Sequence, residues 1–130
     1  LDAAIKDCVV GNRVKDISRA VYEIAHEKHG YGVVYDYCGH GVGLEVHEDP
    51  SIPNDNYFNG GNPRIKPGMV LAIEPMINLG TADVEVAEDG WTVLTCDGEV
   101  SCHEEHTVAV FEDHTEVLTD LNYCGKSVLK

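Results

Sequence analysis

One histidine and two glutamates stand in separate segments of this 130-residue chain, and together they could bind a divalent metal ion. His40 lies in a glycine-rich segment, Glu74 lies in an apolar one, and Glu105 follows a second glutamate. Imidazole nitrogen and carboxylate oxygen suit ions such as Zn²⁺, Mn²⁺, Fe²⁺ and Co²⁺. The glycines on both sides of His40 lack a β-carbon, and we expect them to let the backbone approach a ligand closely.

Glu74 is the most informative of the three residues. It interrupts the apolar run from Met69 to Ile77, where burying an unpaired ionised carboxylate would be costly. The sequence therefore leaves two alternatives open. Glu74 lies on an edge strand or at a bulge, as the following Pro75 favours, or it has a cation as its partner. His40 and Glu105, taken singly, also fit ordinary surface positions.

Composition and charge exclude several classes of partner. The net charge of −14 argues against direct binding to nucleic acid or to an anionic membrane surface. No apolar run reaches the roughly 20 residues of a membrane helix, and no signal-peptide pattern is present. The five cysteines are odd in number and form no CxxC pair, which favours a reducing, cytoplasmic location over a disulfide or zinc-thiolate framework. We expect Cys38 to be a small buried side chain, with a reactive thiol as the alternative.

The elements that must position these residues predict a single α+β domain over residues 1–130. Residues 1–6 resemble the latter part of a helix, and a second helix begins at Lys15 or Asp16 and ends before Gly30. The apolar face of that helix contains Ile17, Val21, Ile24 and Ala25. Strands are predicted at residues 31–37, 69–77, 84–86, 91–96, 107–111 and 116–118, with a hairpin joining 84–86 to 91–96 and a long loop over 51–67.

Six sequence blocks, in this order, carry a family resemblance. They are Tyr37-Cys38-Gly39-His40-Gly41-Val42-Gly43, Val46-His47-Glu48-Asp49-Pro50, Lys66-Pro67-Gly68-Met69, Ile73-Glu74-Pro75-Met76, Asp89-Gly90-Trp91-Thr92 and Glu105-His106-Thr107. Their order and spacing closely resemble type I methionine aminopeptidase. The resemblance implies the pita-bread fold, in which two related halves form a curved antiparallel sheet backed by helices. The chain is similar to the C-terminal half of that catalytic domain.

The resemblance also implies a role for individual residues. His40, Glu74 and Glu105 resemble three ligands of a centre that holds two divalent metal ions (Co, Mn, Fe or Zn) when complete. Glu74 would also handle the proton of a metal-activated water. His47 resembles the second active-site histidine, which contacts the substrate and stabilises the transition state. Trp91 and Met76 resemble residues near the substrate pocket.

The implied activity is metal-dependent removal of N-terminal methionine from a peptide or nascent chain. The family completes its centre with two aspartates from the N-terminal half, which have no counterpart in these 130 residues. One alternative is therefore a non-catalytic half that binds metal or peptide, or that is completed by the missing half or a second chain. Another is a proline-directed peptidase of the same fold, although Glu105-His106-Thr107 is more similar to the methionine enzymes.

Overall fold

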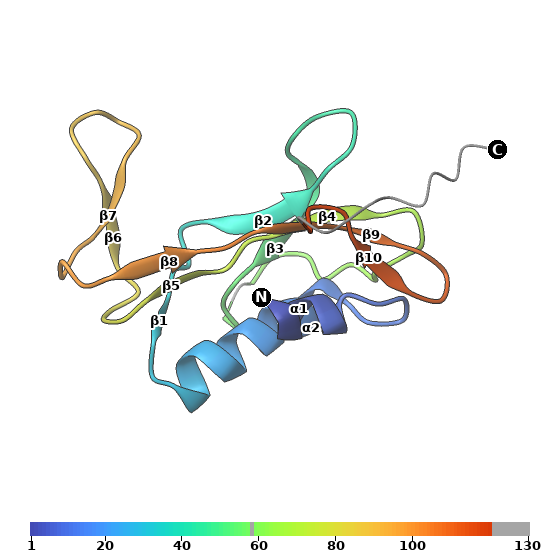
Figure 1. The fold of residues 1–130 in the computed structure, drawn as a ribbon, viewed down its shortest axis with the longest axis horizontal. Coiled ribbons are helices and arrows are strands. Elements are labelled where there is room, and N and C mark those ends of the chain that lie inside the picture. Colours follow the sequence, from blue (N-terminus) through green and yellow to red (C-terminus); the bar gives the residue numbers. More distant parts are fainter. Residues whose placement is uncertain (58, 121–130) are drawn as a thin grey trace.

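Antiparallel sheet lies over a small helical layer in the computed structural model, which describes residues 1–57 and 59–120 (Figure 1). The helices are α1 (Asp2–Asp7) and α2 (Val14–Tyr22), and α2 continues into the π-helical turn η1 (Glu23–Lys28). The strands are β1 (Gly32–Val33), β2 (Cys38–Gly41), β3 (Glu48–Pro53), β4 (Val70–Ile73), β5 (Met76–Asn78), β6 (Val84–Val86), β7 (Val93–Thr95), β8 (Ser101–His103), β9 (His106–Val110) and β10 (Thr115–Val117).

The strands form three antiparallel groups. A five-stranded sheet has the order β10-β9-β4-β2-β3, a three-stranded sheet has the order β1-β5-β8, and β6 pairs with β7 as a hairpin. The helices lie on one side of the strands, and the β6–β7 hairpin and the loop between β2 and β3 project on the other side (Figure 1). This arrangement confirms the predicted α+β class.

A long two-stranded ribbon connects the two larger sheets. β4 pairs with β9, and β5 pairs with β8. Ile73 lies opposite His106, and Met76 lies opposite His103, so the register is the same on both sides of the interruption. No residue is inserted, and Glu74 therefore faces Glu105 across the ribbon.

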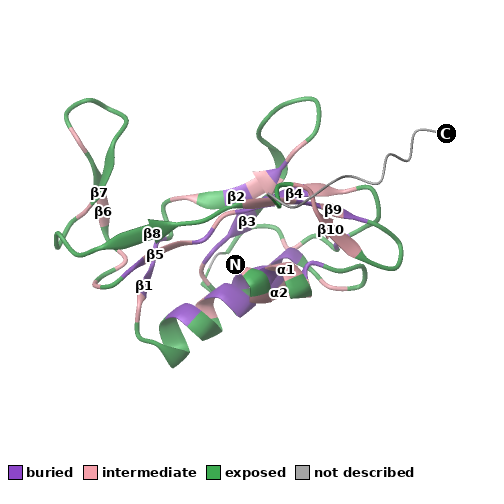
Figure 2. Cartoon of the chain, viewed as in Figure 1, coloured by how far each residue is buried: buried purple, intermediate pink, exposed green. Residues whose placement is uncertain are grey.

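The core lies between the helices and one face of the five-stranded sheet. Strand alternation places Leu71, Ile73 and Val108 on this face, and each has no more than 1% of its surface exposed. Ile17 and Val21 of α2 belong to the same buried cluster. Figure 2 shows the buried residues along α2 and on the strands above it. The opposite face of the sheet is left uncovered by any helix that the structure describes.

The helix predictions are confirmed in kind but corrected in detail. The second helix begins at Val14, one residue before the predicted start, and its last turn is π-helical. Ile24 is 45% exposed, so its predicted place on the buried face is wrong. It lies on the flank of the helix beside α1, in a cavity that Leu1 and Ala3 also line.

The strand predictions succeed where the chain is apolar or has a clear turn. The 69–77 run forms β4 and β5, the 84–96 hairpin is present, and β9 and β10 lie where expected. The predicted strand 31–37 is only the two-residue β1, and β3 takes the first three residues of the predicted loop 51–67. β2 is half glycine and β3 contains two prolines, residue types with low strand propensity, so pairing with neighbours decides their structure.

Candidate metal centre

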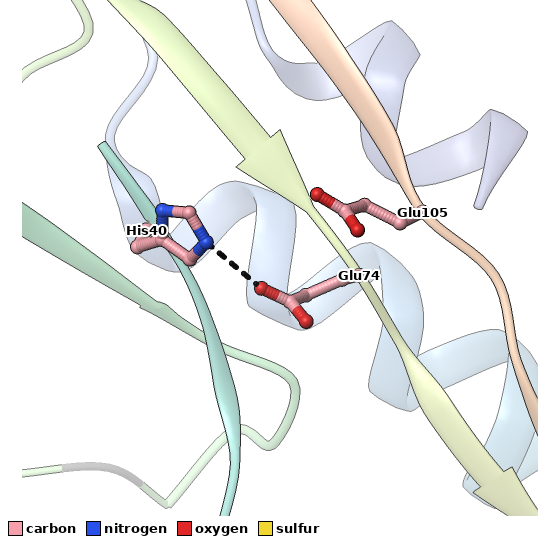
Figure 3. Close-up of side chains that lie close together, drawn as sticks. All are labelled: His40, Glu74 and Glu105. Atoms are coloured by element: carbon pink, nitrogen blue, oxygen red, sulfur yellow. Dashed lines mark ion pairs between the residues drawn. The ribbon is translucent and has the colours of Figure 1, made fainter. Parts of the chain in front are cut away.

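The three predicted ligands come from three adjacent strands. His40 lies in β2, Glu74 directly follows β4, and Glu105 directly precedes β9. His40 pairs with Ala72, and Ala72 pairs with Thr107, so these three side chains share one face of the sheet. Glu74 and Glu105 are each two residues away along their chains and therefore lie on that same face, opposite the helices. Figure 3 shows the three side chains pointing toward one another.

The ligand atoms are close enough to bind one cation. One atom from each of His40, Glu74 and Glu105 lies within 4.8 Å of the other two. Nε2 of His40 is 3.3 Å from Oε1 of Glu74, and the two side chains are only 14% and 13% exposed. Glu105 is exposed, which leaves the cluster open to solvent on its side.

The hydrogen bonding of His40 favours a metal-binding imidazole. Its Nδ1 lies 2.9 Å from the carbonyl oxygen of Gly41. A carbonyl only accepts, so Nδ1–H is the donor, and in the neutral ring Nε2 carries a lone pair. That lone pair faces Oε1 of Glu74, another acceptor, and a cation between them would satisfy both. Metal-binding histidines commonly donate their second ring N–H to a backbone carbonyl in this way.

The two glutamates supply a second reason to expect a cation. Glu74 and Glu105 lie directly opposite each other on one face of an antiparallel ribbon. Like charges in this relation destabilise the pairing. A divalent ion reverses that repulsion, and one nitrogen with carboxylate oxygens is a donor set that such ions accept. The residues therefore fit a divalent metal.

The edge-strand and bulge alternatives for Glu74 are wrong. β4 lies inside the five-stranded sheet between β9 and β2, and the ribbon register does not shift at Pro75. Pro75 lies between β4, whose neighbour is β2, and β5, whose neighbour is β1. Neither neighbour pairs with Pro75, so its missing N–H breaks no hydrogen bond between strands.

The residue that sequence reasoning missed is His103. Its Nε2 lies 3.2 Å from Oε2 of Glu74, so an imidazole contacts each oxygen of this carboxylate. His103 stands two residues before Glu105, and alternation along one strand could have placed both on the same face. The three-residue strand β8 gave too weak a pattern for that prediction.

His47 lies beside the ligand cluster. It is exposed in the loop between β2 and β3, and its ring centroid is 4.1 Å from that of His40, with the rings tilted by 49°. The structure therefore brings together His40, His47, Glu74 and Glu105.

Met76 and Trp91 are placed differently. Met76 helps to line a cavity of about 240 Å³ next to Glu74, on the face that also carries His103. The described residues around this cavity are Val34, Tyr37, Met76, Val84, Val93, Leu94, Thr95, Ser101 and His103. Trp91 is not among them: it is 86% exposed near the tip of the β6–β7 hairpin. The structure thus brings Met76 but not Trp91 to the carboxylates.

The sequence of residues 1–112 matches the profile of the metallopeptidase family M24. The chain belongs to this family. Methionine aminopeptidase from Treponema pallidum is 62% identical over 120 residues, which are 92% of this chain and 47% of that protein. The corresponding protein of Clostridium acetobutylicum is 48% identical over 115 residues, 88% of this chain and 45% of that protein.

Solved structures of the family agree with the pita-bread fold. Methionine aminopeptidase from Thermotoga maritima gives a TM-score of 0.85 at 46% identity over 92% of this chain and 47% of that one. X-Pro aminopeptidase from the same organism gives 0.63 at 27% identity, over 92% of this chain and 28% of that one. The chain spans about half the length of the methionine aminopeptidases it matches. Membership of this metallopeptidase family implies the use of a divalent metal, and His40, Glu74 and Glu105 are a group that could hold one.

The glycines around His40 serve strand packing, and the expected approach of the backbone to a ligand stays a prediction. A β-carbon on Gly39 would collide with the carbonyl oxygen of Ala72 in β4. One on Gly41 would collide with the carbonyl oxygen of Asp49. Both glycines therefore let β2 lie close to its neighbours and so fix the height of the intervening His40 above the sheet.

The cysteine prediction is corrected in one position. Cys38 is exposed, so the expected burial is wrong. Among the cysteines that the structure describes, Cys8 is the buried one, and burial raises its thiol pKa to about 11. Cys8, Cys38, Cys96 and Cys102 are all free thiols, and Cys124 lies outside the described residues. Among the helices of residues 1–57 and 59–120, none has the length and apolarity to cross a membrane.

Proposed function

We propose that residues 1–130 are the C-terminal half of a type I methionine aminopeptidase catalytic domain, and that the complete site removes N-terminal methionine from nascent proteins. The observation that carries the proposal is the convergence of His40, Glu74 and Glu105 on the open face of the sheet. The names of the relatives support the choice of activity, at 62% identity for the Treponema pallidum protein. The free thiols of Cys8, Cys38, Cys96 and Cys102 support a cytoplasmic location.

A divalent metal held by His40, Glu74 and Glu105 would supply the positive charge that activates water and polarises the scissile carbonyl. Cobalt, manganese, iron and zinc all suit this donor set. The complete site is proposed to hold two ions, with two aspartates from the N-terminal half as further ligands. The 130-residue chain alone, with three ligands, is proposed to bind one ion weakly.

The remaining steps belong to side chains of this chain. Glu74, mostly shielded from solvent and in contact with two imidazoles, accepts the proton that the attacking water loses. His47, beside His40, donates to the oxyanion that develops on the substrate carbonyl. The cavity beside Met76 has an apolar lining suited to part of a methionine side chain. Trp91 would join this pocket only through a different position of the β6–β7 hairpin.

The activity is tested by supplying the N-terminal half. The chain would be co-expressed with the N-terminal half of the Treponema pallidum relative, and release of methionine from a Met-Ala peptide would be measured with Mn²⁺ or Co²⁺. We expect metal-dependent release that Glu105→Ala abolishes, whereas Glu99→Ala, an exposed carboxylate on the segment after the hairpin, leaves it unchanged. A folded, metal-loaded assembly that releases no methionine would overturn the proposal.

A non-catalytic half that binds metal or peptide, or pairs with another chain, is the second candidate. The observation in its favour is that the cluster found among the described residues has three ligands, His40, Glu74 and Glu105, fewer than the proposed two-ion centre uses. The intact mass of the native gene product separates the two. A mass well above 14.2 kDa supports the aminopeptidase, and a mass of 14.2 kDa supports the binding or partner-assembled half.

A proline-directed peptidase would use the same three ligands. The higher identity and TM-score of the methionine enzyme, 46% and 0.85 against 27% and 0.63, favour methionine release. Parallel assays on Met-Ala and X-Pro peptides discriminate between them, and cleavage of the X-Pro peptide alone would reverse the assignment.

A further inference from the structure

We propose that His103 is a positioning residue that holds the Glu74 carboxylate in the orientation required at the metal centre. The inference deepens the proposed function and rests on it, because it concerns the same site. It assigns a role to a residue that stands in none of the six blocks from which the family resemblance was drawn.

The contact geometry carries the inference. Nε2 of His103 lies 3.2 Å from Oε2 of Glu74, while Oε1 lies 3.3 Å from Nε2 of His40. Each oxygen of the carboxylate therefore has an imidazole beside it, one from β8 and one from β2. A quarter-turn about the last side-chain torsion of Glu74 would break the contact with His103.

The two imidazoles perform opposite roles toward this carboxylate. A carboxylate only accepts, so the contact with His103 is an Nε2–H donation to Oε2. His40 has already committed its Nδ1–H to the carbonyl of Gly41, which leaves its Nε2 as an acceptor in the neutral ring. Only His103 can hold Glu74 with a neutral ring while leaving the His40 lone pair available for a metal.

His103 itself lies outside the ligand set. Among the described residues, the group whose ligand atoms all lie within 4.8 Å of one another contains His40, Glu74 and Glu105 but not His103. Its contact is therefore with a ligand, and such partners of ligating carboxylates typically change metal affinity or activity by about 10- to 100-fold. A hydrogen bond from His103 acts on the metal only through Glu74.

The backbone explains why this contact forms. His103 lies opposite Met76. Glu105 follows His103 by two residues and Glu74 precedes Met76 by two residues, so all four side chains lie on the same face. His103 also lines the cavity beside Met76. A mere lining role would alter KM for the peptide, whereas a positioning role alters metal affinity and kcat.

The first test measures Mn²⁺ affinity of the 130-residue chain by calorimetry. His103→Leu removes the donor, His103→Gln keeps an N–H at similar reach, and His114→Gln is the control on an exposed histidine far along the sheet. We expect about 10- to 100-fold weaker binding for His103→Leu, with His103→Gln and His114→Gln close to wild type. Circular dichroism and melting curves check that each variant folds, and His103→Asn, with a shorter amide, replaces the leucine variant if that does not.

Three results distinguish a failure of the positioning role from a failure of metal binding. Wild-type affinity in His103→Leu would overturn the positioning role and leave the metal centre intact. Equal weakening in His103→Leu and His103→Gln would also overturn it, because the donated hydrogen would then be irrelevant. Absence of any Mn²⁺ binding by the wild-type chain would overturn the claim that this half binds a metal by itself. The role of His103 is then decided by the ring-nitrogen test below, and the proposed function by methionine release once the N-terminal half is supplied.

The second test needs no metal. Nitrogen-15 NMR of the ring nitrogens distinguishes the two neutral imidazole tautomers. In the metal-free chain at a pH where both rings are neutral, we expect a proton on Nε2 of His103 and on Nδ1 of His40. A proton on Nδ1 of His103, which cannot donate to Glu74 through Nε2, would contradict the positioning role.

Discussion

The two faces of the five-stranded sheet are built from alternate residues of the same strands. On the helix side, Leu71 and Val108 are almost completely buried within the apolar core. On the open side, their neighbours Ala72 and Thr107 lie under a cluster of one histidine and two glutamates. Because side chains alternate between the two faces of a strand, the residues that stabilise the fold lie on one face and the proposed metal ligands lie on the other.

The difference between the faces explains how the site tolerates its charges. The apolar face supplies the free energy that keeps β2, β4 and β9 side by side. The open face can then hold Glu74 opposite Glu105, an arrangement that like-charge repulsion disfavours. Substitutions on the helix face should therefore lower the free energy of unfolding, whereas removal of a glutamate charge on the open face should leave it unchanged or raise it.

The largest expected effect lies on the helix face. Leu71→Ala removes a side chain that is 1% exposed and leaves a cavity in the buried apolar cluster. We expect the free energy of unfolding to fall by about 2–5 kcal/mol. Urea denaturation monitored by circular dichroism measures it. The affinity of the folded fraction for Mn²⁺ should stay unchanged, and a loss below about 1 kcal/mol would show that this face is not the stabilising one.

A smaller effect of opposite sign is expected on the open face. Glu105→Gln removes one of two facing charges and keeps the size of the side chain. In EDTA, we expect the chain to be as stable as wild type or more stable by up to about 1 kcal/mol. Added Mn²⁺ should raise the melting temperature of wild type but not of the variant. Clear destabilisation of the metal-free variant would mean that Glu105 already has a stabilising partner.

The smallest effect is expected away from both faces, at the tip of the β6–β7 hairpin. The Thr92 hydroxyl and the backbone N–H groups of Trp91 and Thr92 donate to Asp89, and these bonds lower the pKa of its carboxyl below 3.8. A lowered pKa gives stability that is present above 3.8 and is lost as pH falls through the folded-state pKa.

Trp91 is the only tryptophan and reports on this turn directly. We expect its fluorescence to change with a midpoint below pH 3.8 in wild type, and the change to be absent in Asp89→Ala. Asp97→Ala, a second carboxylate with a lowered pKa, serves as the control and should keep the transition. A midpoint above 3.8 in wild type would show that the turn does not hold Asp89 ionised.

The sequence predicts the two faces unequally. The apolar run of β4 and its interruption at Glu74 are visible in the sequence, because Leu71, Ala72 and Ile73 are all buried in the centre of the sheet. The ligand set follows from the family resemblance and from the donor types. His103 could not be found in this way, because β8 is short and exposed, and its contact with Glu74 depends on the register of a ribbon whose partner lies 27 positions away at Met76.

The strands β2, which contains His40, and β3 were not predicted from the sequence, because they are rich in glycine and proline. β2 and β3 have compositions typical of turns, yet close approach to Ala72 and Asp49 requires a residue without a β-carbon. Trp91 shows the opposite case. Its sequence block resembles a family motif, yet its side chain is exposed and lies outside the cavity that Met76 lines.

The central claim is that the open face binds a divalent cation through His40, Glu74 and Glu105. Electron paramagnetic resonance of Mn²⁺ titrated into the 130-residue chain tests it most directly, with Glu105→Gln as the probe and Glu99→Gln as the control. We predict one bound ion per chain in wild type and Glu99→Gln, and loss of that ion in Glu105→Gln. Equal binding by wild type and Glu105→Gln, or two tightly bound ions per chain, would contradict the claim.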